Sequence, residues 1–310
     1  MTETTDWKRI FIFLAFAFGI SWAIALVIYL TGGLTNSPVY TIAGIEISLA
    51  LLLMASFYMY GPALANIITR LISKEGFKNL HLKPDFGQKR WVYFLISWFL
   101  PGPLTIAGMV LFFLLFPEHY DSGLSLIKSQ MGLAGINQVN PWLIVALQTL
   151  QATLFAPLLN MLPSFGEEFG WHGYLLPKLL PLGGRKAILL TGIIWGVWHW
   201  PLILMGYNYG ADYAGVPYLG LLAMLWFCVV SGAVFGWLDI KAGSIWPAVI
   251  GHGALNGIAA LSLLFVQGEP NALLGPTPVG IIGGVGFTIA ALFLFLSPKA
   301  FDPVHETNSP

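Results

Sequence analysis

Eight apolar segments long enough to cross a lipid bilayer follow one another along the chain, with polar stretches between them. The first, residues 10–30, holds 21 residues without a charge, and about 20 such residues span the hydrocarbon core. Further spans are predicted at residues 46–71, 91–116, 141 to about 168, 187–205, 217–238, 244–266 and 279–296. This pattern predicts an all-α, polytopic membrane protein with about eight transmembrane helices.

Basic side chains divide unequally between the two sides of this predicted bundle. With the amino terminus inside, Lys128 alone of the 14 Lys and Arg residues falls on the outer side. Cytoplasmic loops carry the excess of positive charge, so we expect both termini in the cytoplasm and the protein in a prokaryotic cytoplasmic membrane. The basic residues on the inner side are Lys8, Arg9, Arg70, Lys74, Lys78, Lys83, Lys89, Arg90, Lys178, Arg185, Lys186, Lys241 and Lys299.

The amino-acid composition agrees with a membrane protein and argues against nucleic acid as a binding partner. Hydrophobic residues make up 57% of the 310-residue chain and charged residues only 9%, against about 25% charged in soluble domains. The net charge of zero gives no basic field for nucleic acid. We expect a cytoplasmic amino terminus (residues 1–9), one transmembrane domain surrounded by membrane lipid (10–296) and a cytoplasmic tail (297–310).

Three polar clusters interrupt the apolar spans. Glu167 and Glu168 are adjacent, Trp195 precedes His199 by four residues, and His252 precedes Asn256 by four. An ionisable group in the membrane costs about 2.5–3.5 kcal/mol on insertion scales and is a functional candidate by default. A structural salt bridge between helices is the alternative explanation for one of the carboxylates.

The three clusters lie at similar depths when each is measured from its nearest inner basic residue. Glu167 is 11 residues from Lys178, His199 is 13 from Lys186, and His252 is 11 from Lys241. At the helical rise these separations are roughly 16, 20 and 16 Å. The sequence therefore predicts one buried polar site built from three helices, and we expect it to open more easily to the cytoplasm.

These residue types suit the hydrolysis of an amide. A carboxylate among aromatic side chains can act as a general base on water, and a neutral His can orient that water or pass a proton. A second His and an Asn amide can donate hydrogen bonds to the developing oxyanion. Alternatively, Glu167, His199 and His252 could bind one divalent metal such as zinc. The residues alone do not choose between these two mechanisms.

The ordered trio resembles the CPBP family of intramembrane proteases. This family includes the type II CAAX prenyl endopeptidases and bacterial bacteriocin-processing and self-immunity (Abi) proteins. Its pattern is Glu-Glu-x-x-x-Arg, then aromatic-x-x-x-His, then His-x-x-x-Asn or Asp. The resemblance covers about residues 154–260 and implies a protease-like core over residues 141–266.

The resemblance also implies a role for each matched residue. Glu167 would activate water beside His199, and His252 with Asn256 would bind the oxyanion. Glu168, His172 and Trp195 would support them. The family's Arg corresponds here to His172, which shares a helix face with Glu168 and can replace that Arg only as a hydrogen-bond donor or a cation. We expect His172→Arg to preserve or improve function.

The leading hypothesis is a membrane-embedded endopeptidase that cleaves a peptide bond near the cytoplasmic face. Its substrate would be a CAAX-type lipidated protein or a bacteriocin-like peptide. A non-catalytic immunity or partner-binding membrane protein is the second hypothesis, and the His172 departure favours it. A proton-coupled transporter is the third, since an acidic cavity also suits a proton site. The sequence identifies no particular substrate, metal dependence or oligomeric state.

Overall fold

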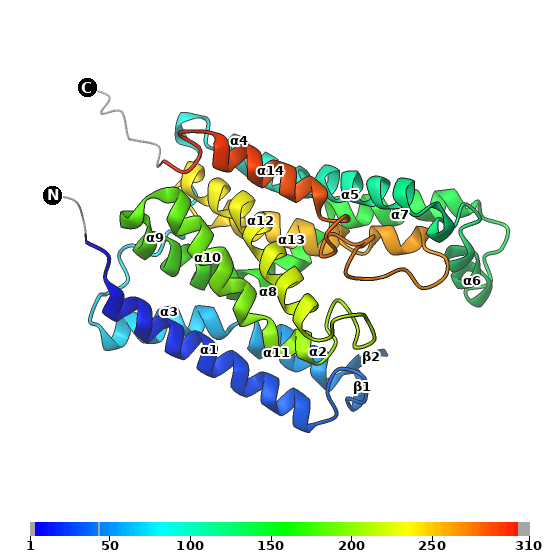
Figure 1. The fold of residues 1–310 in the computed structure, drawn as a ribbon, viewed down its shortest axis with the longest axis horizontal. Coiled ribbons are helices and arrows are strands. Elements are labelled where there is room, and N and C mark those ends of the chain that lie inside the picture. The colour runs from blue at the N-terminus through cyan, green and yellow to red at the C-terminus, as the bar shows by residue number, and fades with distance from the viewer. Residues whose placement is uncertain (1–3, 43, 303–310) are drawn as a thin grey trace.

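The computed structural model describes residues 4–42 and 44–302, and helices make up most of this part of the chain (Figure 1). The predicted all-α class is confirmed. The end of the expected tail, from position 303 onward, lies outside the described residues.

The helices follow one another in this order: α1 (Trp7–Leu30), α2 (Leu49–Leu53), α3 (Gly61–Ile72), α4 (Trp91–Phe99), α5 (Pro101–Leu115), α6 (Ser125–Leu133), α7 (Pro141–Leu154), α8 (Ala156–Gly170), α9 (Leu176–Leu179), α10 (Gly184–Trp198), α11 (Trp200–Leu204), α12 (Tyr218–Ala242), α13 (Trp246–Ile258) and α14 (Val285–Leu296). Two π-helical segments, η1 (Met54–Tyr58) and η4 (Trp171–Leu175), and four 3-10 segments, η2 (Gly87–Lys89), η3 (Pro117–His119), η5 (Leu180–Leu182) and η6 (Leu261–Phe265), lie between them in the described ranges.

Membrane-length helices account for most of the predicted spans. Within the described residues, five are long and apolar enough to cross a bilayer: Trp7–Leu30, Leu49–Ile72, Gly87–Leu115, Tyr218–Ala242 and Trp246–Phe265. A sixth arises if the pair Pro141–Leu154 and Ala156–Leu182, bent by 43°, forms one span. The polytopic membrane class is thus confirmed, and the count of eight remains a prediction.

Prolines interrupt two of the predicted spans. Residues 91–116 form α4 and α5, and α5 begins at Pro101. Residues 187–205 form α10 and α11, with Pro201 in the first turn of α11. Proline lacks the amide hydrogen that would continue the helix behind it, but it is tolerated at a helix start. Each proline therefore lies at the start of a new hydrogen-bonded helix, while Leu100 and His199 between the paired helices keep α-helical backbone angles.

A small β-hairpin replaces the expected start of the second span. Strands β1 (Val39–Ile42) and β2 (Ile45–Ser48) pair antiparallel, with Thr41 opposite Glu46. The Ser48 hydroxyl accepts a hydrogen bond from the backbone N–H of Leu51 and caps α2, as short polar side chains do at helix starts. The helix thus begins three residues later than predicted.

Helix α8, which carries the glutamate pair, lies inside the bundle and packs against α3 and α13 (Figure 1). Two glycines make the α3 contact close. A Cβ on Gly166 would lie 2.6 Å from the carbonyl oxygen of Met59, and one on Gly170 would lie 2.3 Å from the Pro62 ring. Small residues at such contacts are typical of membrane helices. The contact fixes the depth of the glutamates.

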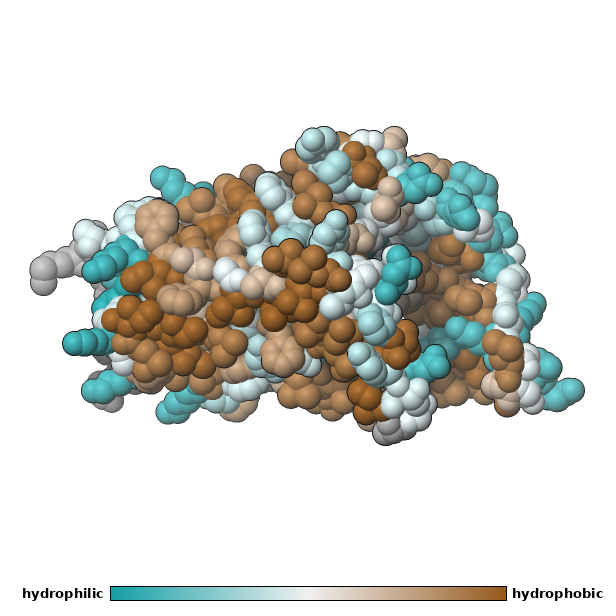
Figure 2. Space-filling model, turned by 90° about the horizontal axis from the view of Figure 1, so that it is seen from below, coloured by the Kyte–Doolittle hydropathy of each residue, from teal (hydrophilic) through white to brown (hydrophobic). Residues whose placement is uncertain are grey.

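Most of the basic residues lie on segments at one end of the bundle, where α1 begins and α14 ends (Figure 1). Arg9, Arg70 and Lys178 all surround Glu75, while Lys241 donates to the Lys299 carbonyl oxygen. We call this the basic end. On the face seen in Figure 2, apolar side chains cover much of the middle and hydrophilic ones gather towards the two ends, as expected for a protein that crosses a membrane.

Candidate active site

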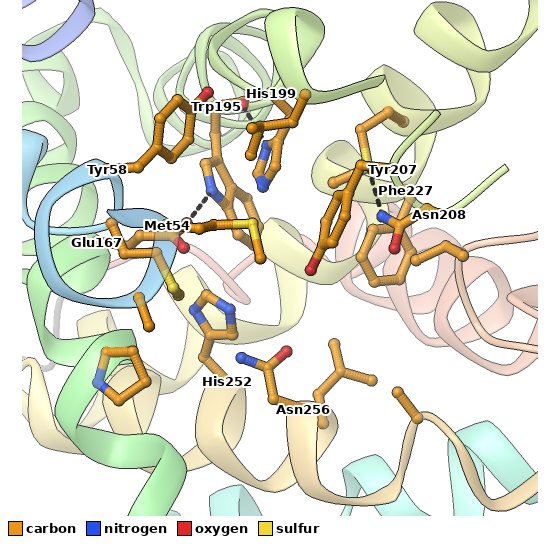
Figure 3. Close-up of a pocket in the computed structure, with 18 of the residues that line it drawn as sticks. Met54, Tyr58, Glu167, Trp195, His199, Tyr207, Asn208, Phe227, His252 and Asn256 are labelled. Atoms are coloured by element: carbon orange, nitrogen blue, oxygen red, sulfur yellow. Dashed lines mark hydrogen bonds between the residues drawn. The ribbon is translucent and has the colours of Figure 1, made fainter. Parts of the chain in front are cut away.

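A cavity of about 340 Å³ lies between α2–η1, α8, α10–α11, α12 and α13. Glu167, Trp195, His199, His252 and Asn256 all line it (Figure 3). Side chains from three sequence segments that are far apart in the chain therefore face one space. Glu168 and His172 do not line the cavity and lie behind it, fully buried.

Glu167 is held by an aromatic donor. The indole Nε1–H of Trp195 donates a hydrogen bond to Oε2 of Glu167 over 2.6 Å, and the carboxylate is only 2% exposed. A Trp indole can donate but never accept, so this contact orients the carboxylate without removing its capacity to take a proton. The aromatic position of the second motif thus contacts the first motif directly.

His199 is held in one tautomer by the backbone. Its Nδ1 lies 2.9 Å from the carbonyl oxygen of Trp195. Since a carbonyl oxygen only accepts, Nδ1 carries the hydrogen, and the neutral ring leaves Nε2 as an acceptor. The ring packs edge-on against Trp198. The available nitrogen of His199 is therefore a base.

The interruption between α10 and α11 at His199 is stabilised by neighbouring helices. The Trp198 carbonyl oxygen accepts hydrogen bonds from Trp22 of α1 over 3.1 Å and from the Tyr58 hydroxyl of η1. The Leu202 N–H, which would be the α-helical partner of this oxygen, donates to the His199 carbonyl oxygen instead, and buried carbonyls need substitutes. These two contacts anchor the His199 segment to the first two spans.

Glu168 joins two histidines. Its Oε1 accepts a hydrogen bond from Nδ1 of His252 over 2.7 Å, and its Oε2 contacts Nδ1 of His172. His172 thus occupies the place of the family's Arg and makes the contact with Glu168 that the i,i+4 spacing predicts. With Nδ1 committed to Glu168, Nε2 is the remaining ring nitrogen of His252. The ring of His252 also stacks on Phe235, with centroids 5.7 Å apart.

The back of this cluster packs tightly against α12. Nε2 of His172 has no hydrogen-bond partner among the described residues, and neither does Oδ1 of Asp239. A Cβ on Gly236 would lie 3.3 Å from that His172 nitrogen. An Arg at position 172 would need this space, although Asp239 would offer it a counter-charge.

Two aromatic residues of the site were missed by the sequence analysis. Tyr58 and Tyr207 line the cavity, and in Figure 3 the Tyr207 hydroxyl points into the space between His199 and Asn256. Tyr207 belongs to the segment Gly206-Tyr-Asn-Tyr-Gly210, which follows α11. Its only signal was a polar aromatic cluster soon after the second motif.

The side chains around the cavity include possible metal ligands. Nε2 of His199, Nε2 of His252 and the Glu167 carboxylate are ligands that zinc accepts. However, the described residues contain no group of three or more His, Cys, Asp or Glu side chains close enough together to hold an ion. The residues as arranged do not fit a metal, and we derive no catalytic step through one.

The direction in which the cavity opens differs from the expectation. Its exposed lining residues are Leu51 near the start of α2, Asn208 after α11 and Asn256 near the end of α13. All three lie towards the end of the bundle opposite the basic end. The sequence analysis expected the opening at the basic, inner end, and depth along the helices does not reveal at which end the lining is exposed.

The fold and the site together define a polytopic helical membrane protein with a buried carboxylate–imidazole cluster. Residues 146–258, which include all three motifs, match the family model described as Type II CAAX prenyl endopeptidase Rce1-like. This match, together with a curated relative, supports the CPBP/CAAX protease family and confirms the resemblance seen in the motifs.

The curated relative comes from an archaeon. The chain is 29% identical over 154 residues to CAAX prenyl protease 2 of Methanococcus maripaludis. The alignment covers 48% of this chain and 53% of that protein, so the chain spans about half the length of the curated relative it matches.

Proposed function

We propose that the protein is an intramembrane endopeptidase in which Glu167 activates a water molecule. The observation that carries this proposal is the placement of the two adjacent carboxylates. Glu167 faces the cavity with a single donor from Trp195, while Glu168 lies behind it and binds two imidazoles. One carboxylate is available to a substrate and the other orients the machinery.

The reaction follows from these positions. Glu167 takes a proton from water as the water oxygen attacks the carbonyl carbon of the scissile amide. The Asn256 amide and His252 stabilise the oxyanion, and His252 can donate through Nε2 only as an imidazolium, for which Glu168 is the counterion. The amide nitrogen then takes the proton back from Glu167, directly or through Nε2 of His199, and the C–N bond breaks.

The substrate class is supported by the lining and by the relative. Met54, Met59, Met224, Phe227 and Leu255 line the cavity, and flexible Met side chains adapt to varied apolar shapes. The archaeal relative is named a CAAX prenyl protease, which makes a prenylated peptide one candidate. A bacteriocin-like apolar peptide fits the same lining.

The non-catalytic alternative rested on His172 in place of Arg. Since His172 contacts Glu168, the departure does not favour an incomplete site. The metal-assisted variant has a direct test: dialysis against a chelator followed by zinc addition would abolish and restore cleavage if an ion closed on Glu167, His199 and His252.

The experiment that tests the proposal compares protein termini in membranes of cells producing the wild type, Glu167→Gln or Glu46→Gln at equal abundance. Glu46 is an exposed carboxylate on the hairpin, so Glu46→Gln is the matched control. New termini are expected with the wild type and Glu46→Gln and should disappear with Glu167→Gln. Identical termini in all three strains would refute proteolysis.

A further inference from the structure

Helices α3 and α8 are in close contact between the glutamates and the basic end of the bundle. A second cavity of about 620 Å³ lies at the basic end, and it shares no lining residue with the cavity at Glu167. Gly166 and Gly170 bring α8 against α3 without space for a side chain. One turn away, the Asn66 amide of α3 donates to the Phe169 carbonyl oxygen over 2.7 Å, and its side-chain oxygen accepts from Nε of Arg70 over 2.7 Å. Both Asn66 and Arg70 are buried. This contact seals the α3–α8 seam on the cytoplasmic side.

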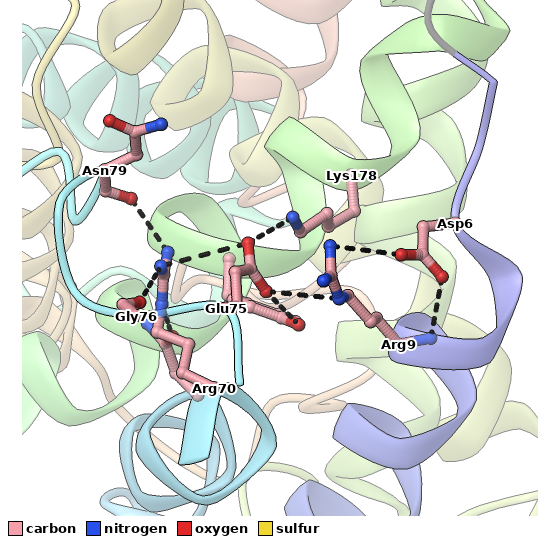
Figure 4. Close-up of polar contacts among 9 residues, drawn as sticks. Asp6, Arg9, Arg70, Glu75, Gly76, Asn79 and Lys178 are labelled. Atoms are coloured by element: carbon pink, nitrogen blue, oxygen red, sulfur yellow. Dashed lines mark hydrogen bonds and ion pairs between the residues drawn. The ribbon is translucent and has the colours of Figure 1, made fainter. Parts of the chain in front are cut away.

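A second layer of polar contacts lies outside this seam. Glu75 accepts hydrogen bonds from Lys178 and from the Tyr174 hydroxyl, and it pairs with Arg9 and Arg70 at 3.7 and 3.9 Å (Figure 4). Arg70 also donates to backbone carbonyl oxygens of the loop that follows α3. We call Arg9, Arg70, Glu75 and Lys178 the basic-end cluster. It ties α1, α3 and α9 together across the basic end.

The opposite end of the same helices is open. Leu51 is 49% exposed, whereas Tyr58, seven residues further along the same span, is fully buried. Leu51 is 19 residues from Arg70, or roughly 28 Å along a helix. Glu167 is about 16 Å from Lys178 on the same scale. The cavity therefore runs from Glu167 away from the basic-end cluster.

The orientation of the chain in the membrane determines which side the mouth of the cavity faces. Loops rich in Lys and Arg face the cytoplasm, so the mouth at Leu51, Asn208 and Asn256 faces the other way. The face seen in Figure 2 is also visibly hollowed in its right half.

We propose that the substrate of this protein is an apolar polypeptide segment that enters the site from the extracytoplasmic half of the membrane. This inference rests on the proposed function and names the substrate by its side of approach. A lipidated tail in the cytoplasm would have to separate α3 from α8 and break the basic-end cluster to reach Glu167. A segment that approaches from the other side meets the exposed Leu51 and the partly exposed Met54, which line the cavity.

The direction can be measured without knowing the substrate. In a Cys228→Ala background, which removes the buried native thiol, single cysteines are placed at Met54 and Asn208 in the cavity and its mouth. Lys78→Cys, at an exposed position of the basic end, is the matched control. A membrane-impermeant maleimide is then applied to right-side-out and to inside-out vesicles.

We expect Met54→Cys and Asn208→Cys to be labelled at least tenfold faster in right-side-out vesicles, and Lys78→Cys to show the reverse preference. Labelling of Met54→Cys from the cytoplasmic side, from both sides or from neither side would overturn the inference. Labelling of Lys78→Cys in right-side-out vesicles would overturn it too, because the whole chain would then be inverted.

Cleavage positions give the second measurement. New termini that depend on Glu167 should lie in the extracytoplasmic halves of apolar segments, and termini confined to cytoplasmic tails would overturn the inference. Because labelling needs no activity, the two proposals can fail separately. If the termini do not differ between the wild type and Glu167→Gln but the labelling is as expected, the protease proposal is refuted and the inferred direction of access stands.

Discussion

The two faces of α8 around the glutamate pair differ more than their adjacency in sequence suggests. Successive residues on a helix point about 100° apart, so Glu167 faces the cavity while Glu168 faces packed imidazoles. Glu167 receives one hydrogen bond from Trp195 and Glu168 contacts two histidines. The same side chain thus has different surroundings at neighbouring positions, and under the proposed function Glu167 performs the chemistry while Glu168 orients the histidines.

The largest expected effect on activity comes from substituting Glu167, on the face of α8 that lines the cavity. Glu167→Gln keeps the shape of the side chain and its contact with Trp195 but cannot take up a proton. We expect cleavage to fall by about 10²–10⁴-fold, the range for loss of a general base, with the thermal midpoint in detergent nearly unchanged. Turnover of an identified substrate and a melting curve check this prediction. Wild-type turnover in this variant would remove Glu167 from the mechanism.

On the packed face, Glu168→Gln should lower stability as well as activity. Removing one partner of a buried charged cluster costs about 3–5 kcal/mol, because the histidines lose their shared acceptor. The thermal midpoint of the purified protein should therefore fall clearly, unlike that of Glu167→Gln. If the two variants melt alike, the division between the two faces is wrong.

The variant Tyr207→Phe tests whether a second side chain of the cavity contributes to the reaction. The hydroxyl points into the space beside Asn256 (Figure 3) and can donate to an oxyanion without first being protonated. We expect kcat to fall by about 10²-fold, the lower end of the range for removing one oxyanion donor, with little change in stability or in the KM of a substrate. Tyr209→Phe serves as the control, since that hydroxyl donates to the Val279 carbonyl oxygen rather than into the cavity.

The smallest expected effect lies outside both faces, at Glu75. Burial would raise the pKa of its carboxyl, but the hydrogen bond and charge of Lys178 and the charge of Arg70 outweigh burial and lower that pKa. A lowered folded pKa contributes stability above the unfolded pKa, near about 4.3, and this stability is lost as the pH falls through the folded value.

Glu75→Gln should therefore cost about 1 kcal/mol or less at pH 7. The difference from the wild type should shrink as melting is repeated at lower pH, below about 4.3. A difference that stays constant with pH would mean that packing, rather than charge, holds the basic-end cluster together.

The residues around Glu167 could be found from sequence because each motif has helical spacing. Glu168 and His172 are four apart and meet, and Trp195 and His199 are four apart and join through the Trp195 carbonyl oxygen. The contact between Glu168 and His252 joins residues 84 positions apart, and no periodicity predicts such a pairing.

The sequence analysis did not predict two other features, the β-hairpin and the close contact between α3 and α8, and the physical reasons differ. Residues 46–48, predicted as the start of the second span, instead pair with residues 39–41 of the neighbouring strand, and this cross-strand pairing overrides the helix there. The contact between α3 and α8 depends on how closely the two helices approach at Gly170. Closeness of approach is a property of two helices together, so the sequence of either span leaves it undetermined.

The fixed tautomers of the two site histidines have a consequence for ligands. Both rings use their Nδ1 hydrogens on internal acceptors, Trp195 and Glu168, so in their neutral forms each leaves Nε2 as a lone pair. In that neutral form, before His252 takes up a proton, the cavity offers two imidazole lone pairs among apolar side chains. Small electrophiles with an apolar body, such as an alkyl boronic acid, should be trapped there in preference to anionic hydroxamates.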